Sequence, residues 1–350
     1  MLLLGLALAA FGLTGRVVDT QVPLRVPLLG VKWAYFLAHR DEYTTVYLGT
    51  SLVRHHVVPE VVDAQLRAAG IPERSFNLGM AHMTYPEARQ LLARLVALRP
   101  ARLRRVVLDA SLFLDTRHSN DLTPRHLWWH TPGETARILA RIAEFDAPVG
   151  RRLERARVEA QALLIAETAA GRAAEAFRAA WDPGFRGHDE SDDPVTMAGY
   201  RDLDTMRSRS ALRQRRRMQR DPGYFERQVE QRRRNQRARK LPRAEREALD
   251  ELVGQVARAG WQPVVLETAS TKPRFEFSPV VRKQAIVLSL NDPLKYPELY
   301  QAAAWHDYNH MNNAGARAAS LLLGDAFAAA LAGPAGARPG LRRGDGPGPR

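Results

Sequence analysis

The chain has 350 residues, of which 45% are hydrophobic, so it is long enough to bury a sizeable core in one large domain or two smaller ones. It contains no cysteine, which excludes disulfides, a thiol nucleophile and a cysteine-ligated zinc site. Its formal net charge of +14 suggests an acidic partner, such as nucleic acid, an anionic membrane or an acidic polymer.

An apolar segment opens the chain. Residues 2–13 form an uninterrupted apolar run, whereas a membrane-spanning helix needs roughly 20 apolar residues. We therefore interpret residues 1–13 as a signal peptide or a membrane anchor, and expect export to the periplasm or to the extracytoplasmic face of a membrane. An ordinary buried helix is the alternative. Residues 14–43 show little periodicity and are expected to form a connecting stretch.

Strand and helix patterns then alternate along the chain. Apolar runs rich in β-formers are separated by segments whose apolar residues recur at helical spacing, and the alternation resumes near residue 243. This order predicts an α/β protein with a parallel sheet, because parallel neighbours need crossover helices between them. We expect strands at 44–49, 75–80, 105–110 and 262–267, followed by a further apolar run at 285–290, and helices at 57–69, 85–98, 243–259 and about 313–331.

A long helical insertion interrupts this pattern. Residues 132–242 are rich in Ala, Arg, Glu and Gln, and they predict helices at 134–145, at 151–180 and in the arginine-rich stretch that follows. We expect one insertion or cap within an α/β domain that spans 14–331. The tail at 332–350 is rich in Gly, Pro and Arg, and is expected to be disordered.

The arginine-rich stretch concentrates the positive charge. Residues 201–247 hold 17 Lys and Arg against 7 Asp and Glu, a local excess of +10. A solvated helical face is the first interpretation, and a surface for anionic lipid or acidic polysaccharide is the second. Nucleic acid ranks third, because the stretch has few aromatic residues and no recognised motif.

The first candidate catalytic group is Ser51, which follows the expected strand at 44–49 in the sequence Gly49-Thr50-Ser51. A serine at a strand-to-helix turn exposes its hydroxyl at the carboxyl edge of the sheet, where ligands bind in such folds. The alternative is a helix N-cap. Gly79 follows the next strand, where a glycine lets a backbone N–H approach a substrate closely, or is an ordinary turn glycine.

Asp307 and His310 lie three residues apart, just before the last expected helix. On a helical turn this spacing places both side chains on one face. The carboxylate can then accept the Nδ1 proton of the histidine, fix its tautomer and raise its basicity. A surface aspartate beside a capping histidine is one alternative. A metal site is another, since His306 and His310 are spaced i, i+4, but no further ligand pattern matches and we expect no metal.

Together these motifs resemble the SGNH (GDSL-like) hydrolase superfamily over about residues 44–131 and 243–331. The resemblance implies a three-layer α/β/α, flavodoxin-like fold with the helical stretch as an insertion. It implies that Ser51 is the nucleophile, that Asp307 and His310 form its proton relay, and that the N–H groups of Ser51 and Gly79 hold the oxyanion. Asn313-Ala314-Gly315 is similar to the family's continuation into the last helix.

Two departures from the family pattern bear on catalysis. Thr50 stands where the first block usually has Asp, and the Gly-x-Asn-Asp block is absent. Leu108-Asp109-Ala110-Ser111 follows the third strand instead, which leaves Ser111 as a weak substitute for the missing side-chain donor to the oxyanion. These departures recur in exported, membrane-tethered SGNH-like proteins that work beside O-acyltransferases in teichoic-acid D-alanylation and alginate acetylation.

The resemblance therefore implies a serine esterase or O-acyltransferase that forms an acyl-serine and needs no cofactor. It points to an acylated, for instance acetylated, cell-envelope or exported polysaccharide as substrate, and to a membrane-bound O-acyltransferase as partner. A catalytically inactive SGNH scaffold that binds glycan or a membrane partner is the alternative, and an arginine-rich nucleic-acid-binding protein is a further one.

Three further residues are candidates for substrate contacts. Arg54, one helical turn after Ser51, is expected either to bind an anionic substrate or to pair with a carboxylate. Trp128 and Trp129 are expected either to line a sugar subsite or to anchor the insertion by packing, and packing is favoured. The neighbouring residues 55 and 56, both histidines, are expected at the surface.

Overall fold

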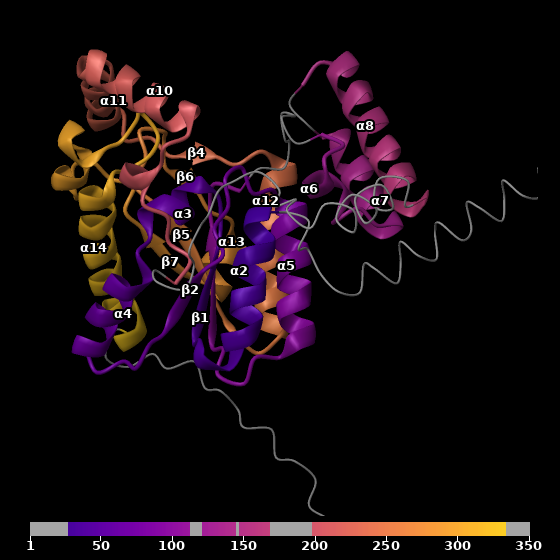
Figure 1. The fold of residues 1–350 in the computed structure, drawn as a ribbon, viewed down its shortest axis with the longest axis horizontal. Coiled ribbons are helices and arrows are strands. Elements are labelled where there is room, and N and C mark those ends of the chain that lie inside the picture. The colour runs from indigo at the N-terminus through magenta and orange to yellow at the C-terminus, as the bar shows by residue number, and fades with distance from the viewer. Residues whose placement is uncertain (1–26, 113–120, 145–146, 169–197, 334–350) are drawn as a thin grey trace, which may run out of the picture.

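A five-stranded parallel sheet lies at the centre of the molecule (Figure 1). The computed structural model describes residues 27–112, 121–144, 147–168 and 198–333. The spatial order β2-β1-β3-β5-β7 corresponds to 2-1-3-4-5 when only these strands are counted, which is a doubly wound order. The predicted parallel α/β sheet is thus confirmed. The strands are β1 (Thr45–Leu48), β2 (Ser75–Asn77), β3 (Arg105–Asp109), β5 (Gln262–Glu267) and β7 (Ile286–Ser289).

Helices cover both faces of the sheet, because successive side chains of a strand point to opposite sides. In β1, Val46 and Leu48 belong to one hydrophobic cluster and Tyr47 to the other. The first cluster packs under α2 (Pro27–His39), α5 (Tyr85–Leu98), α12 (Arg243–Arg258) and α13 (Pro279–Gln284). The second packs under α3 (Ser51–His56), α4 (Pro59–Ala68) and α14 (Asn313–Ala332).

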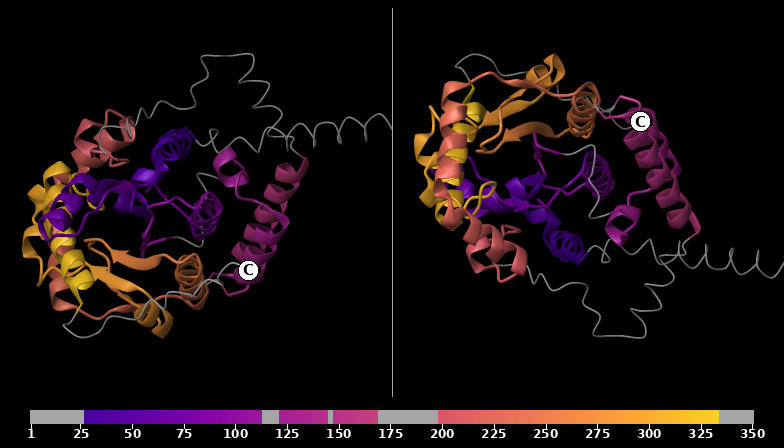
Figure 2. Two further views of the ribbon diagram at one scale, coloured as in Figure 1. Left: turned by 90° about the horizontal axis from the view of Figure 1, so that it is seen from below. Right: turned by 90° about the horizontal axis from the view of Figure 1, so that it is seen from above.

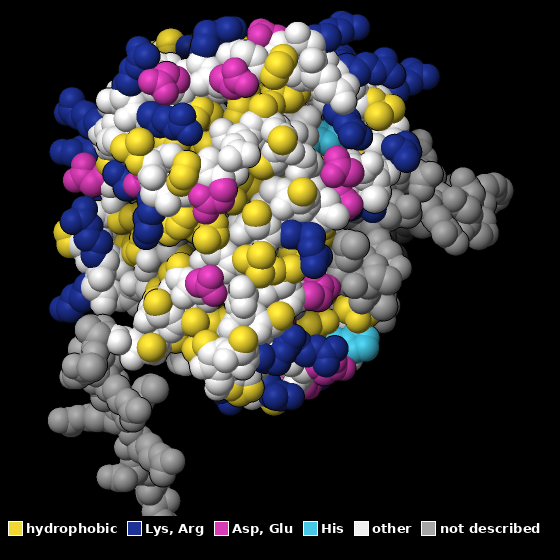
Figure 3. Space-filling view, turned by 90° about the vertical axis from the view of Figure 1, so that its left-hand side faces the viewer, with side chains coloured by type: hydrophobic (Ala, Val, Ile, Leu, Met, Phe, Trp, Pro, Cys, Tyr) yellow, Lys and Arg dark blue, Asp and Glu magenta, His cyan; other side chains and the backbone are white. Residues whose placement is uncertain are grey.

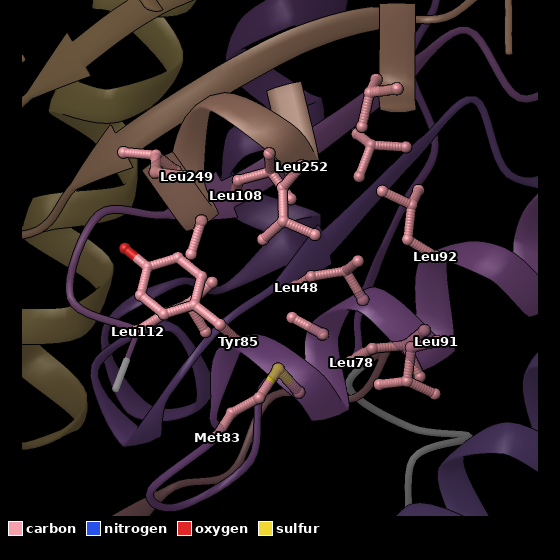
Figure 4. Packing of buried hydrophobic residues seen from close by; sticks show 14 of the residues in the cluster. Leu48, Leu78, Met83, Tyr85, Leu91, Leu92, Leu108, Leu112, Leu249 and Leu252 are labelled. Atoms are coloured by element: carbon pink, nitrogen blue, oxygen red, sulfur yellow. The ribbon is translucent and has the colours of Figure 1, made fainter. Parts of the chain in front are cut away.

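Leucines fill the space between the sheet and the first helical layer (Figure 4). Leu48 and Leu108 come from neighbouring strands, Leu91 and Leu92 from α5, and Leu252 from α12. All five are at most 1% exposed. Full burial of such a side chain stabilises the folded protein by roughly 1.5–3 kcal/mol. This layer therefore helps to hold the strands side by side, with their carboxyl ends at one edge of the sheet.

Helix α5 shows why some boundaries follow from local sequence. Thr84 and Glu87 form a capping box, in which the Thr84 hydroxyl accepts the Glu87 N–H and the Glu87 carboxylate accepts the Thr84 N–H. Pro86 occupies the first turn, where its missing N–H is not needed. The helix ends at Arg99, which adopts a left-handed conformation with φ 45°. The predicted helix at 85–98 is confirmed at both ends.

The expectation of a connecting stretch at 14–43 is wrong over its second half. Residues 27–39 form α2, with Leu29, Trp33 and Phe36 fully or almost fully buried. The helix has apolar side chains of its own on every face, so its sequence lacks the one-sided periodicity that marks a surface helix. Lys32 is also buried, and its ammonium group donates to the carbonyl oxygens of Gly79 (2.9 Å) and Asn77 (3.3 Å).

The helices of the insertion do not form one cap. Figure 1 and Figure 2 place α7 and α8 beside α5 and α12, and place α10 and α11 at the opposite side of the molecule, next to the loops that precede α14. The expected helix at 151–180 is observed as far as 168, and residues 1–13 and 334–350 lie outside the described part.

The remaining elements are α6 (Pro124–Leu127), α7 (Pro132–Ile142), α8 (Val149–Thr168), α10 (Arg209–Arg220), α11 (Pro222–Arg234), the paired strands β4 (Arg239–Lys240) and β6 (Phe275–Glu276), and the 3₁₀ turns η1 (Arg40–Glu42), η2 (Leu203–Thr205), η3 (Pro297–Tyr300) and η4 (Ala302–Ala304).

Helix α14 is the one described helix that is long and apolar enough to cross a membrane by length and composition alone. Its Leu323 and Phe327 side chains are buried in the second cluster, and the helix packs along α4. Gly324 permits this close packing, since an added Cβ would lie 2.5 Å from the Gln65 Cβ. In the structure α14 is therefore a layer of the α/β core.

Candidate active site

Ser51 is the first residue of α3, directly beyond the carboxyl end of β1. The N-cap is Thr50, whose hydroxyl accepts the Leu52 N–H at 3.3 Å. The capping function considered for Ser51 therefore belongs to its neighbour. This leaves the Ser51 hydroxyl free to interact with a side chain across the edge of the sheet.

The turn before Ser51 is unusually close to β3. A Cβ on Gly49 would lie 2.6 Å from the Cβ of Asp109 and 2.4 Å from a methyl group of Val53. Only glycine fits this approach without displacing either neighbour. The glycine thus places the start of α3 within hydrogen-bonding distance of the end of β3.

Asp109 holds this turn in place. Its buried carboxylate accepts the backbone N–H (2.8 Å) and the hydroxyl (2.6 Å) of Thr50 through Oδ2. Through Oδ1 it accepts the N–H (2.8 Å) and the hydroxyl (2.7 Å) of Ser111. A buried carboxylate must be hydrogen-bonded, and these four bonds tie the loop before Ser51 to the loop after β3.

Ser51, His310 and Asp307 form a continuous hydrogen-bonded relay. Nε2 of His310 lies 2.9 Å from the Ser51 hydroxyl, and Nδ1 lies 3.0 Å from Oδ2 of Asp307. Since a carboxylate only accepts, Nδ1 carries the proton and Nε2 is left to accept from the serine. Burial would raise the pKa of Asp307, but its hydrogen bonds and charge interaction with His310 outweigh burial and lower that pKa. Asp307 therefore remains a carboxylate.

The relay is carried by a tight loop, and the expectation of a helical turn is wrong. One oxygen of Asp307 accepts the N–H groups of Asn309 (2.7 Å) and His310 (2.9 Å), which closes the loop around its own side chain. At its base, Trp305 and Met311 form an antiparallel bridge. The three-residue spacing still brings the carboxylate to the imidazole, because an aspartate can bond to the backbone two and three residues ahead.

His55 and His56 are buried behind the relay, contrary to the surface position expected. Nδ1 of His55 donates to the carbonyl oxygen of Arg201 (2.7 Å), and Nε2 of His56 accepts the N–H of Met311 (3.0 Å). Burial lowers the pKa of both, that of His56 to about 3. They are therefore neutral rings, and His56 braces the base of the loop that carries His310.

The predicted oxyanion donors are largely engaged elsewhere. The N–H of Gly79 donates to Oδ1 of Asn77 at 2.8 Å, and both the N–H and the hydroxyl of Ser111 donate to Asp109. Gly79 is required for packing, since a Cβ there would lie 2.6 Å from the Arg54 nitrogen. Among the described residues, no partner is found for the N–H of Ser51, which belongs to the first turn of α3 where donors lack intrahelical acceptors.

The predicted substrate-contact residues are not exposed binding groups. Arg54 is buried, and its carbonyl oxygen accepts the Arg201 N–H at 3.1 Å. Trp129 is buried in the core cluster that includes α5, and Trp128 packs against that cluster with the Arg94 guanidinium over its ring. The packing alternative for the two tryptophans fits this arrangement.

A buried cluster between α6 and α8 contains residue types that can ligate a metal, although the sequence reasoning missed it. One ligand atom each of His126, His130 and Glu159 lies within 4.8 Å of the others. The hydrogen bonds describe an ion-pair network instead, because the Glu159 carboxylate is paired with the Arg155 guanidinium as well as with His130 Nε2 (2.7 Å). The i, i+4 spacing of the two histidines was the available signal, but Glu159 lies too far along the chain to complete a pattern.

The spacing of His306 and His310 does not form a metal site. His310 is fully engaged in the relay, while Nδ1 of His306 faces Oδ1 of Asp204 at 3.4 Å. The two rings therefore have separate carboxylate partners.

The arginine-rich helices brace the relay loop. The hydroxyl of Tyr308 lies 3.1 Å from the carbonyl oxygen of Arg217 and 3.0 Å from that of Asp221, and the ring of Phe225 contacts Trp305. The arginines of α10 and α11 are mostly exposed around this apolar contact. The two helices thus expose most of their arginines to solvent on one side and support the relay loop on the other.

Neither protein-family models, nor curated proteins, nor solved structures gave a match to the chain. The function is therefore argued from the site, since a doubly wound fold supports many unrelated activities.

Proposed function

We propose that the protein transfers or hydrolyses acyl esters through an acyl-serine at Ser51. The observation that supports this most is the relay in which Ser51 Oγ, His310 and Asp307 are joined by contacts of 2.9 and 3.0 Å. A nucleophile that contacts a base, which is in turn oriented by a third group, is the arrangement that activates a hydroxyl.

The steps follow from this arrangement. Nε2 of His310 takes the Ser51 hydroxyl proton while Oγ attacks the ester carbonyl, and a tetrahedral oxyanion forms. His310 then returns the proton to the departing alcohol, which leaves an acyl-serine. Water or a second hydroxyl then loses its proton to His310 and attacks the acyl-serine. The bond between the acyl carbon and Oγ breaks, and His310 returns the proton to Oγ. Asp307 keeps Nδ1 protonated and stabilises the imidazolium.

The open N–H of Ser51 is suited to stabilise the oxyanion, and such a donor is worth on the order of 3 kcal/mol. In the geometry described, Gly79 and Ser111 contribute none, since their donors bond to Asn77 and Asp109. We therefore expect a modest rate of catalysis, unless the substrate provides a donor to the oxyanion or displaces the internal hydrogen bonds of Gly79 or Ser111.

The resemblance to SGNH hydrolases extends the proposal to the substrate and its location. It supports an acylated cell-envelope or exported polysaccharide as substrate, an exported protein held near a membrane by its first residues, and a membrane-bound O-acyltransferase as partner. An anionic surface at the arginine-rich helices fits the same setting, and nucleic acid remains the lower-ranked occupant.

Labelling with a fluorophosphonate probe tests the proposal directly. We expect the folded protein to be labelled, and labelling to be lost in both Ser51→Ala and His310→Ala. Ser210→Ala is the matched control, because Ser210 is exposed on α10 and should leave labelling unchanged. Labelling that persists in Ser51→Ala would show that another residue is the nucleophile.

A catalytically inactive scaffold is the second candidate function. It is favoured by one observation, namely that the donors of Gly79 and Ser111 are both committed to internal bonds. A well-folded protein that takes no fluorophosphonate label under conditions that label a known serine esterase would favour this candidate over the enzyme.

A further inference from the structure

A separate polar pocket lies next to the loop that carries Asp307 and His310. Its volume is about 190 Å³. It lies where the C-terminal half of α10 and the start of α11 meet the loop before α14. Neither Ser51 nor His310 lines it. The groups that matter for recognition are Arg215, Gln219, His306 and Asp204.

His306 contributes a buried nitrogen without a partner. Its side chain is 1% exposed, and its Nδ1 faces Oδ1 of Asp204 at 3.4 Å. Its Nε2 is buried and has no hydrogen-bond partner among the described residues. The other Asp204 oxygen accepts the N–H of Asn313 at 3.0 Å, so the carboxylate is occupied at the back of the pocket. A buried nitrogen without a hydrogen bond destabilises the folded protein, and a ligand that contacts it would remove that penalty.

Arg215 contributes a positive charge that no acidic side chain neutralises. Within the described ranges it has no ion-pair partner, and α10 contains six arginines and no Asp or Glu. Gln219 lies one turn further along the same helix and also lines the pocket. Figure 3 shows Lys and Arg side chains crowded along the upper edge of the face where Figure 1 places α10 and α11.

We propose that this pocket binds a small oxyanion, a phosphate or a carboxylate group. A guanidinium presents two parallel N–H donors that match either group, and the Gln219 amide supplies a further donor. Nδ1 of His306 faces Asp204, so Nε2 is the ring nitrogen left for the ligand. The Arg215 guanidinium then balances the charge of a bound monoanion.

Occupation of the pocket has a consequence for the relay. The N–H of His306 donates to the carbonyl oxygen of His310 at 2.8 Å. An anion held against His306 therefore rests on the backbone that carries Asp307 and His310. The binding itself does not depend on the proposed acyl chemistry at Ser51.

Calorimetric titration tests this site with two probes, inorganic phosphate and glucuronate, at pH 7 and fixed ionic strength. We expect saturable one-to-one binding of at least one probe, and the stronger binder identifies phosphate or carboxylate as the natural group. Arg215→Gln should weaken that binding at least tenfold. Arg213→Gln removes the same charge from α10 at a position that does not line the pocket, and should change affinity less than twofold.

His306→Gln gives a second variant, and it should also weaken binding if both groups contact the anion. Ser51→Ala should bind as well as the unmodified protein, which separates this result from failure of the proposed enzyme function. The proposal is overturned if neither probe binds saturably, or if Arg213→Gln weakens binding as much as Arg215→Gln, since that would indicate general attraction to a basic helix.

Discussion

Asp109 is the residue on which the position of Ser51 depends most. The serine has no bond of its own to β3; its place follows from Thr50, which is bonded twice to the Asp109 carboxylate. The same carboxylate holds Ser111. Asp109 thus acts as a positioning residue that ties the turn before Ser51 to the end of β3.

Asp109→Asn tests this dependence. An amide places an NH₂ group where two donors already point, and the loss of bonds to a charged acceptor should lower the free energy of unfolding by about 3 kcal/mol. Labelling at Ser51 should slow in protein that is still folded. Urea denaturation and labelling rates measure the two effects. Asp325→Asn is the charge-matched control on an exposed face of α14, and equal behaviour of the two variants would contradict the assignment.

His56 links the site to the acid stability of the protein. Its buried ring has a pKa of about 3, against an ordinary value of 6.5, because burial disfavours the charged form. The unfolded chain therefore binds a proton more readily than the folded one. Stability from His56 is present above pH 6.5 and is lost as the pH falls toward 3.

His56→Gln should remove this part of the pH dependence. Below pH 6.5 the unmodified protein should lose up to about 1.4 kcal/mol per pH unit relative to the variant, since one extra proton is bound on unfolding. Urea denaturation at pH 7.5, 6 and 5 measures the difference, in which all other titrating groups cancel. Parallel stability curves for the two proteins would show that the ring is not held neutral.

At the scale of elements, the start of α14 sets the position of the relay loop. Asn312 caps the helix by accepting the N–H of Gly315 at 2.9 Å, and the Asn312 N–H donates to Ala304. A Cβ on Gly315 would lie 2.1 Å from the Ala304 carbonyl oxygen. The helix can therefore approach the loop only because this residue is glycine.

Two glycine substitutions, which should change the free energy of unfolding in opposite directions, test this contact. Gly315→Ala should lower the free energy of unfolding by about 1–3 kcal/mol, since an added group must push backbone apart. Gly254→Ala, in the middle of α12, meets only the end of the flexible Arg258 side chain and should raise it by up to about 1 kcal/mol. Thermal melts of both variants measure this, and similar shifts in the same direction would contradict it.

At the scale of the whole molecule, the insertion contributes to two different places. The pair α7 and α8 lies beside α5 and α12, where α7 makes partly exposed ion pairs, including the contact of Arg141 with Glu251 at 3.1 Å. The pair α10 and α11 is fastened to the relay loop through Tyr308 and Phe225. The positive charge of the chain is thereby concentrated next to the candidate site, where it favours negatively charged ligands.

Much of the overall fold could be predicted from the sequence. The strands and most helices of the α/β core were predictable because their signals are local, as the capping box at Thr84 and Glu87 illustrates. The contact between Asp307 and His310 was predictable because the two residues are near neighbours, whereas their combination with Ser51 was expected from the resemblance to SGNH hydrolases. Helix α2 was missed because its exposed face also carries apolar residues, such as Val31, so the sequence shows no one-sided pattern.

By itself, then, the sequence determined the parallel α/β order and the pairing of Asp307 with His310, since both rest on short-range periodicity and spacing. Only the tertiary structure decided that the Gly79 N–H is committed to Asn77, that His55 and His56 are buried, and that the insertion divides between two ends. It alone placed Arg215 beside His306. These outcomes depend on contacts between residues far apart in the chain, and such contacts arise from packing rather than from any local pattern.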